Sequence, residues 1–575
     1  MKPPPGLKLR LITGSQAIST RRLLLFLSGI LLLSVSALLF IPASLLTTAE
    51  QSVIGLDIAH SHIPDSIKDL NPFKPTSHTP PPPSTNSTGS SDSWFSSWKW
   101  LNPFSSNIAV GDEERSVLPP MPKRCPVYTF YDSDAKGDDA EVEDQLLLAW
   151  RRAFWAQGFQ PVVLGMGEAK EHGMYRVIRD TGNFHPDFER ELMRWLAWSR
   201  MGTGVLVDYR VIPMAPYDDH TFTALRRCDF TYATRYENYG HRVFAGDKAS
   251  IDAVLKYITS AKVDNGTVTI EGATKMANDL FHIDPLPKSF ADYTSEAIKI
   301  KYPKLQLSDL PKLINAHLHE NWIARYQSGI SLLLPFPETL GALHYPAQVL
   351  AARLAACPVD NPEPESCPTN KQDCKPCKKG LKVTPSKTFT NKTGVFSLGT
   401  IPHPYTFIAL TNPEINLSTD SEDKSIRFVR RRTERDEWLR AVTTPVSIGS
   451  GPRVVTIKAA TANPTSTTIL STSDAGFKDI EWTLGFTLPT EEEVKLDLPK
   501  PDAQQVKVLD MTHKDAFSAK DGGKKKRLRR AVEAWNLGGT EVWKFGRAYV
   551  DRMEMERRKW SEAEKAFGRG MAKDE

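Results

Sequence analysis

Hydrophobic and polar positions along the chain predict short buried strands separated by helices. Residues 126–131 form an apolar run long enough for one buried strand, and residues 142–157 repeat apolar side chains at helical spacing. A second short apolar run follows at residues 161–164. Strand, helix and strand in this order predict two parallel strands joined by a crossover helix, and therefore an α/β domain.

The same alternation returns further along and ends on charged residues. Residues 188–200 predict an amphipathic helix, and residues 205–207 predict a buried strand that leads directly into Asp208 and Arg210. Ligands of open α/β sheets bind beyond the carboxyl ends of the strands. A carboxylate at that position can hold a divalent cation, which neutralises a diphosphate leaving group. Asp208 is therefore a candidate binding residue.

These residues resemble the sugar-binding region of DXD-type glycosyltransferases, the Golgi type II enzymes that include fungal mannosyltransferases. The segment Glu191-Leu-Met-Arg194, an aromatic-rich helix, a glycine-containing turn, the strand and Asp208 follow the order of that family. The likeness covers about 200 residues, from Cys125 to about Trp322. It implies a GT-A-like domain in which Glu191, Arg194 and Asp208 bind a nucleotide-sugar.

A second part of the resemblance concerns a metal site. The segment His317-Leu-His-Glu-Asn-Trp322 is similar to the closing histidine-rich segment of the family. The resemblance implies that His317 and His319 join Asp208 in holding Mn²⁺ or Mg²⁺.

One departure from the family affects the predicted chemistry. Arg210 stands where the family has the second aspartate of its motif, so the resemblance assigns the catalytic positions to Asp208 and Arg210. A guanidinium cannot ligate a cation, but it can contact a diphosphate as a bidentate donor. Three readings stay open: a metal held by Asp208 with fewer protein ligands, a metal-independent site, or a site that is not catalytic.

The N-terminus predicts a membrane anchor. Residues 23–41 are almost continuously apolar, and at about 1.5 Å per residue they match a hydrocarbon layer of roughly 30 Å. Basic residues precede this run, and no acidic residue occurs before Glu50, which favours a cytosolic N-terminus and a lumenal bulk. A cleaved signal peptide is the alternative, although its apolar core is usually shorter. Four possible N-glycosylation sites follow the run, at Asn86, Asn265, Asn391 and Asn416.

The cysteines suggest disulfides. Cys357, Cys367, Cys374 and Cys377 contain only one closely spaced pair, whereas structural zinc sites usually show two. Two disulfides are therefore favoured over zinc in an oxidising lumen. Cys125 and Cys228 remain and can form a third, but the spacing does not give the connectivity.

The second half of the chain has a different pattern. Short alternating runs at 395–398, 406–410, 453–457 and 480–486 predict a mainly β extension, and a charged helical tail follows. The predicted organisation is a cytosolic tail (1–22), an anchor (23–46), a Pro/Ser-rich stem (47–122), a glycosyltransferase-like α/β domain (123–345), a cysteine-containing loop (346–390), a β-rich extension (391–510) and a charged helical tail (511–575).

The composition limits the choice of partners. Lys and Arg number 73 against 68 Asp and Glu, and so small an excess gives no argument for nucleic-acid binding. We therefore predict a type II protein of the Golgi or endoplasmic-reticulum membrane that transfers a sugar from a nucleotide-diphospho-sugar to a glycan or glycoprotein acceptor. The alternatives are an inactive glycosyltransferase-like scaffold and a lectin-like lumenal protein.

Overall fold

The structure is a computed structural model, and it describes the parts of the chain that carry three sheets. The described residues are 77–81, 123–132, 139–181, 184–260, 272, 275, 277–284, 288–334, 341–371, 373–387, 392–401, 454–458, 474–495, 498–508, 532, 534, 537 and 555–571. The predicted anchor, most of the predicted stem and the four possible glycosylation sites lie outside them. Within these ranges, every helix is too short or too polar to cross a bilayer.

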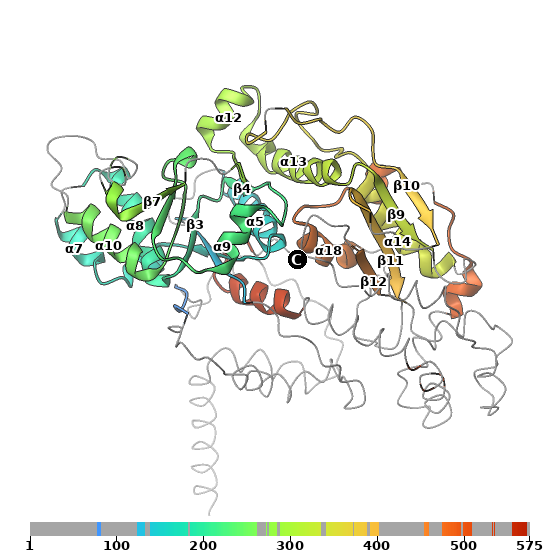
Figure 1. Ribbon diagram of the computed structural model, residues 1–575, viewed down its shortest axis with the longest axis horizontal. Coiled ribbons are helices and arrows are strands. Elements are labelled where there is room, and N and C mark those ends of the chain that lie inside the picture. The colour runs from blue at the N-terminus through green and yellow to red at the C-terminus, as the bar shows by residue number, and fades with distance from the viewer. Residues whose placement is uncertain are drawn as a thin grey trace, which may run out of the picture. The chain divides into compact units, whose positions relative to one another are not determined.

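The first sheet has six strands in the order β2-β1-β3-β6-β5-β7. Its strands β3 and β7 are labelled in Figure 1. β1 pairs in parallel with both β2 and β3, whereas β6 runs antiparallel to its neighbours β3 and β5. The parallel pair predicted from the alternation of strand, helix and strand is therefore confirmed. The bounds are β1 (Pro126–Phe130), β2 (Gln160–Leu164), β3 (Gly204–Val207), β5 (Ala233–Tyr236), β6 (Val243–Gly246) and β7 (Phe281–Asp284).

Helices cover both faces of this sheet because its strands are apolar on both sides. Val127 packs in one buried cluster with Trp150, while the next residue, Tyr128, packs in another with Trp195. Successive side chains of a strand point to opposite faces, so the two clusters lie on opposite sides of the sheet. The helices of this region are α5 (Ala140–Ala156), α6 (Met166–Lys170), α7 (Tyr175–Thr181), α8 (Pro186–Met201), α9 (His220–Arg227) and α10 (Lys248–Ser260).

A small two-stranded sheet holds the chain that leaves β3. β4 (Val211–Pro213) pairs antiparallel with β8 (Phe290–Asp292), so that Val211 lies opposite Asp292. The amide of Tyr293 also donates to the carbonyl oxygen of Arg210 over 2.8 Å. The segment after Asp208 is thus held by backbone hydrogen bonds to residues 290–293. α12 (Ser295–Lys301) and α13 (Leu310–Arg325) follow β8.

The second sheet is parallel, with strand order β10-β9-β11-β12. Its core includes Ile330, Leu350 and Phe396. The predicted strands at 395–398 and 453–457 correspond to β11 and β12, which pair with each other in parallel. β11 also pairs in parallel with β9, which the sequence had assigned to the first domain. The bounds are β9 (Gly329–Leu333), α14 (Gly341–Ala355), β10 (Val383–Ser386), β11 (Val395–Ile401), β12 (Val454–Lys458), α18 (Asp474–Leu484) and α19 (Glu491–Val494).

The prediction of a strand at 480–486 is wrong, because residues up to Leu484 belong to α18. Ile480 packs in the core of the second sheet, whereas Trp482 packs with Trp155 and Trp560. A helix buried on two sides carries apolar residues two positions apart, which imitates the alternation of a strand.

All six cysteines form disulfides. The bonds join Cys125 to Cys228, Cys357 to Cys377, and Cys367 to Cys374. The preference for disulfides over zinc in the cysteine-containing loop is confirmed, and the structure supplies the connectivity.

Candidate functional site

The order of the strands marks one point of the first sheet as a candidate ligand site. From β1 the chain crosses through α5 to β2 on one side, then returns through α6, α7 and α8 to β3 on the other side. The strand order therefore reverses at β1 and β3. In open α/β sheets, ligands bind in the crevice beyond the carboxyl ends of the strands at such a reversal. Tyr131 and Asp132 follow β1 there, and Asp208 follows β3.

Asp208 lies in a tight turn at this position. Its amide donates to the carbonyl oxygen of Arg242 over 2.9 Å, and its own carbonyl oxygen accepts from the amide of Val211 over 2.9 Å. Its side-chain oxygen Oδ1 accepts from the amide of Arg210 over 2.8 Å. The carboxylate is half-buried and stabilises the turn between β3 and β4, a common role of aspartate after a strand.

Arg210 is paired with Glu143 in the first turn of α5. Its Nη2 donates to Glu143 Oε1 over 2.5 Å, and the Tyr209 hydroxyl donates to Oε2 of the same carboxylate. Burial alone would lower the pKa of Arg210, but its neighbours Tyr209, Glu143 and Asp208 raise it. Burial and the contact with Glu143 also raise the pKa of Tyr209. The turn after β3 and the start of α5 are thus joined by one network of hydrogen bonds.

The sequence did not single out Glu143. It belongs to the acidic run between Asp132 and Asp144, which composition alone predicts to be a solvated loop or a helix N-terminus. Glu143 could have been found from its position in the first turn of a predicted helix that follows a predicted strand. Such a turn starts near the carboxyl edge of the sheet.

Arg194 supports Asp208 through the backbone. Its Nη1 donates to the carbonyl oxygen of His241 over 2.7 Å, and its Nη2 donates to that of Arg242 over 3.1 Å. The Arg242 carbonyl is the same one that accepts from the amide of Asp208. Glu191 lies 3.9 Å from Arg194 and 3.7 Å from the His241 ring. The predicted donor-binding residues Glu191 and Arg194 therefore surround the turn that holds Asp208.

Arg242, whose carbonyl oxygen accepts from the Asp208 amide, is the third arginine at this turn. Arg242 Nη1 donates to Asp292 Oδ2 over 3.1 Å, and its Nη2 donates to Glu296 Oε2 over 2.7 Å. Asp292 Oδ1 also accepts from the amide of Thr294 over 2.9 Å. The region around Asp208 thus contains arginines and carboxylates in pairs.

The two predicted histidine ligands have other partners. His317 Nδ1 lies 2.7 Å from the Tyr293 hydroxyl, and its Nε2 lies 2.8 Å from Ser366 Oγ. His319 Nε2 lies 3.0 Å from the Leu354 carbonyl oxygen, and its ring stacks on Phe486. Burial lowers the pKa of His317 to about 3 and that of His319 to about 4, so both rings are neutral.

The predicted metal site is not assembled. In the described part of the chain, no three His, Cys, Asp or Glu side chains come together in a way that could hold a metal ion. His317 contacts the Tyr293 hydroxyl, and the Tyr293 amide donates to the carbonyl oxygen of Arg210. Asp208, His317 and His319 thus do not form a metal-binding group among the residues that the structure describes.

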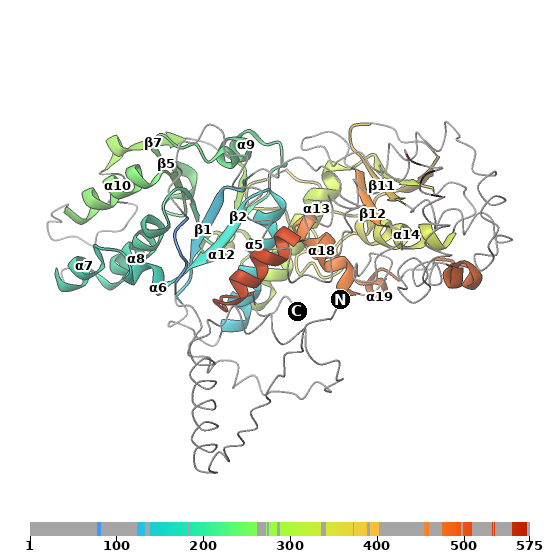
Figure 2. The same cartoon turned by 90° about the horizontal axis from the view of Figure 1, so that it is seen from below.

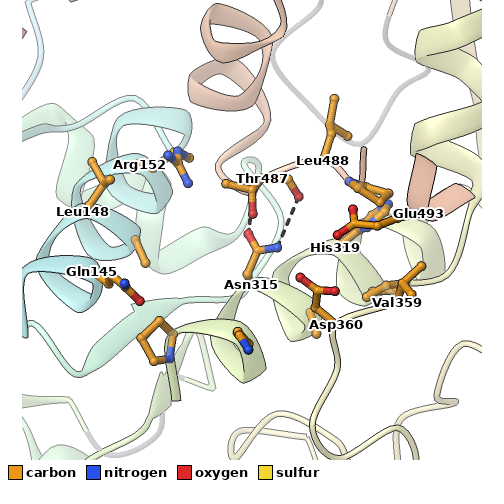
Figure 3. Close-up of a pocket in the computed structure, with 16 residues that line it drawn as sticks. Gln145, Leu148, Arg152, Asn315, His319, Val359, Asp360, Thr487, Leu488 and Glu493 are labelled. Atoms are coloured by element: carbon orange, nitrogen blue, oxygen red, sulfur yellow. Dashed lines mark hydrogen bonds between the residues drawn. The ribbon is translucent and has the colours of Figure 1, made fainter. Parts of the chain in front are cut away.

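A separate pocket of about 250 Å³ lies between α5, α13 and residues 487–489 (Figure 3). Asn315 bridges it by donating to the Thr487 carbonyl oxygen over 3.2 Å and accepting from its amide over 2.6 Å. Its charged lining is balanced, with two cations and two carboxylates: Arg152, Lys312, Asp360 and Glu493. Asp208 does not line this pocket.

Comparison with protein families assigns the chain to a group of similar sequences. The family described as Domain of unknown function (DUF8765) matches residues 88–575. The chain belongs to this family. No curated protein and no solved structure matches it significantly.

Proposed function

We propose that the chain is a glycosyltransferase of the secretory pathway, with its nucleotide-sugar site at the carboxyl ends of β1 and β3. The observation that carries the proposal is the position of Asp208, directly after β3 where the strand order reverses. The parallel arrangement of β2, β1 and β3 supports the GT-A-like interpretation of this domain. The acceptor would be a glycan or a glycoprotein hydroxyl.

The chemistry would depend on how the leaving group is stabilised. When the bond between sugar and phosphate breaks, negative charge develops on the nucleoside diphosphate, and fixed cations stabilise it. Arg210 is the cation closest in sequence to Asp208, but Glu143 already binds it. A donor phosphate would therefore have to replace or share this carboxylate. Arg194 would act as a positioning residue, because it holds the turn rather than a ligand.

A requirement for Mn²⁺ or Mg²⁺ is part of the same proposal. Because the two histidines are engaged elsewhere, Asp208 would be the protein ligand at this edge of the sheet, and substrate phosphates would complete the coordination. Magnesium is commonly bound in this way, through one or two carboxylates plus phosphates.

The proposed compartment is the lumen of the Golgi or endoplasmic reticulum, with residues 23–46 as a type II anchor. Three disulfides support an oxidising environment, because such bonds are rare in cytosolic proteins. The apolar run and the preceding basic residues support the orientation.

A second candidate is an inactive scaffold with the same fold. The ion pair between Arg210 and Glu143 favours it, because this pair occupies the cation that a diphosphate would need. A lectin-like role remains the further alternative for the second half of the chain.

Binding of nucleotide-sugars to the full-length chain tests the proposal. Calorimetric titration with a panel of nucleotide-diphospho-sugars, with and without Mn²⁺, should show one donor that binds wild type and binds Asp208→Asn at least about tenfold more weakly, since a charge contact to phosphate is lost. Asp247→Asn is the matched control, because Asp247 Oδ1 also accepts from a backbone amide, that of Ser250, at the start of α10. Asparagine keeps that acceptor in both variants.

The outcomes separate the two candidates. Equal binding by wild type and Asp208→Asn would remove Asp208 from the site. An absence of binding across the whole panel would favour the scaffold. Binding without transfer to any glycan acceptor would leave a nucleotide-sugar-binding protein without the proposed activity.

A further inference from the structure

A cluster of charged side chains is buried beside β2, the edge strand of the first sheet. We call it the clasp. All of its members are at most 9% exposed, although they come from segments far apart in the sequence. They are His78 from residues 77–81, Arg151 from α5, Glu168 from α6, and Glu564 and Arg569 from residues 555–571.

The C-terminal segment, residues 555–571, covers the open edge of the sheet. Trp560 Nε1 donates to the carbonyl oxygen of Pro161 over 3.0 Å, and Arg569 Nη1 donates to that of Val163 over 2.6 Å. The Trp560 ring also stacks on Trp155. Figure 2 shows the red helix of this segment alongside α5 and β2. Side chains of the segment thus satisfy edge carbonyls that would otherwise face solvent.

Glu168 is the centre of the clasp. Its carboxylate accepts from the amides of Gly165 and His78 over 2.7 and 2.8 Å, and from Arg569 Nη1 over 3.1 Å. Burial opposes its charge, but the contacts with His78 and Arg569 lower its pKa to about 2. One buried carboxylate of α6 therefore binds residues 77–81, the residue before α6 and the C-terminal segment at the same time.

His78 connects the two carboxylates of the clasp. Its Nδ1 lies 2.6 Å from Glu168 Oε1, its Nε2 lies 3.2 Å from Glu564 Oε1, and its ring stacks on Phe567. An ionised carboxylate only accepts hydrogen bonds. When both carboxylates are ionised, this geometry is satisfied by an imidazolium, in which both ring nitrogens carry protons.

The remaining charges surround this ring. Arg569 binds Glu168 from one side, and Arg151 Nη2 lies 3.4 Å from Glu564 Oε2 on the other. Arg151 also donates to the carbonyl oxygen of Arg569. With His78 protonated, the clasp holds three cations and two carboxylates. A neutral His78 would leave one of its nitrogens facing a carboxylate without a proton between them.

We propose that the clasp is a pH-dependent contact. Protonated His78 holds residues 77–81 and the C-terminal segment against the edge of the first sheet, and deprotonation of His78 releases both. The proposal is independent of the chemistry at Asp208. It makes residues 77–81 and the C-terminal segment respond together to the pH of their compartment.

The direction of the pH effect follows from His78. Burial alone would lower its pKa, but the hydrogen bonds and charges of Glu168 and Glu564 raise it above the ordinary value of 6.5. A raised histidine pKa gives a stabilisation that is complete below pH 6.5 and is lost as the pH rises through the raised value. Burial lowers the pKa of Arg151 only to about 10, and the pKa of Glu168 is lowered to about 2. Neither group therefore changes its charge substantially between pH 5.5 and 9.

Hydrogen exchange of the full-length chain between pH 5.5 and 9 tests this pH-dependent contact. After correction for intrinsic exchange rates, protection of the C-terminal segment should be constant below pH 6.5. Above the raised pKa it should fall by up to about tenfold per pH unit, the limit for one linked proton. His78→Gln should show low protection at every pH. His282→Gln, which changes an exposed histidine on β7, is the matched control and should follow wild type.

Two further measurements keep the proposal falsifiable if His78→Gln does not fold. Glu564→Gln removes one charge facing His78, so its loss of protection should begin at a lower pH than in wild type. Peptides from α8 report global unfolding in the same spectra. Constant wild-type protection of the C-terminal segment up to pH 9, or a simultaneous loss in α8, would overturn the proposal.

Discussion

Arg210 and Glu143 form an ion pair of 2.5 Å that joins the turn after β3 to the first turn of α5. Arg210 lies two residues beyond Asp208, at the carboxyl edge of the first sheet. Any anionic ligand that reaches Arg210 must therefore compete with a carboxylate of the protein itself. Stability and ligand binding are opposed at this position.

Removing the charge of Glu143 should lower the stability of the protein and raise its affinity for an anionic ligand. Glu143→Gln is expected to lower the free energy of unfolding by about 1–2 kcal/mol, because two partly buried donors lose a charged acceptor. It should also raise the affinity for a nucleoside diphosphate, since Arg210 loses its competitor. Urea unfolding and calorimetric titration measure the two effects.

An exposed ion pair of equal length provides the control. Arg179 and Glu189 also lie 2.5 Å apart, but their side chains are 56% and 26% exposed. Glu189→Gln should change stability less than Glu143→Gln does, because solvent screens exposed pairs. A Glu143→Gln protein as stable as wild type would show that the partly buried pair contributes nothing.

Arg194 should be sensitive even to a conservative substitution. Arg194→Lys is expected to cost about 1.5–3 kcal/mol, because a lysine ammonium cannot reproduce the planar fork that binds two carbonyl oxygens. Arg190 lies on the same helix and is exposed, so Arg190→Lys should stay within about 0.5 kcal/mol of wild type. Denaturant unfolding measures both, and equal stabilities for the two variants would contradict this role of Arg194.

The disulfides should differ in their contribution to stability. The bond between Cys125 and Cys228 closes a sequence separation of 103, whereas that between Cys367 and Cys374 closes one of 7. In the loop-entropy treatment, replacing the first pair with alanines should cost about 2 kcal/mol more than replacing the second. Thermal unfolding of the two double variants measures the difference. The opposite order would mean that effects on the native state outweigh loop closure.

Glu320 should make the protein less stable as the pH rises towards neutrality. Burial raises the pKa of this carboxyl to about 7, although Asn361 and a backbone contact at Cys377 oppose the shift. Between its ordinary value of 4.5 and 7, the folded state keeps a proton that the unfolded state has lost. Stability should therefore fall with rising pH, by up to about 1.4 kcal/mol per pH unit from this group.

Comparison of urea unfolding at several pH values between 4.5 and 7.5 tests the effect. Glu320→Gln should remove this part of the slope, whereas Glu365→Gln, on a side chain that is 83% exposed, should keep it. The same slope in wild type and Glu320→Gln would assign the pH dependence to other groups.

Local patterns predicted the elements of the first sheet well. The apolar runs at 126–131, 161–164 and 205–207 correspond to β1, β2 and β3, because strands buried on both faces read as continuous apolar segments. The same reasoning failed at α18, where burial on two sides imitates a strand.

The candidate site was predictable only in part. The position of Asp208 at a strand end followed from a local pattern, and the structure places it at the reversal of strand order. The family resemblance implied metal ligands at His317 and His319, but tertiary packing gives both rings other partners. A resemblance in the order of residues does not show which side chains are already hydrogen-bonded.

The sequence by itself determined the strands and helices around Asp208 and the presence of enough cysteines for three bridges. The tertiary structure decided the partner of Arg210, the pairing of β9 with β11, and the meeting of His78 with Glu564, which are 486 residues apart. The physical reason is the distance along the chain over which each interaction acts. Backbone propensity and apolar periodicity act over a few residues, whereas charge pairs and strand neighbours depend on which distant surfaces are buried together.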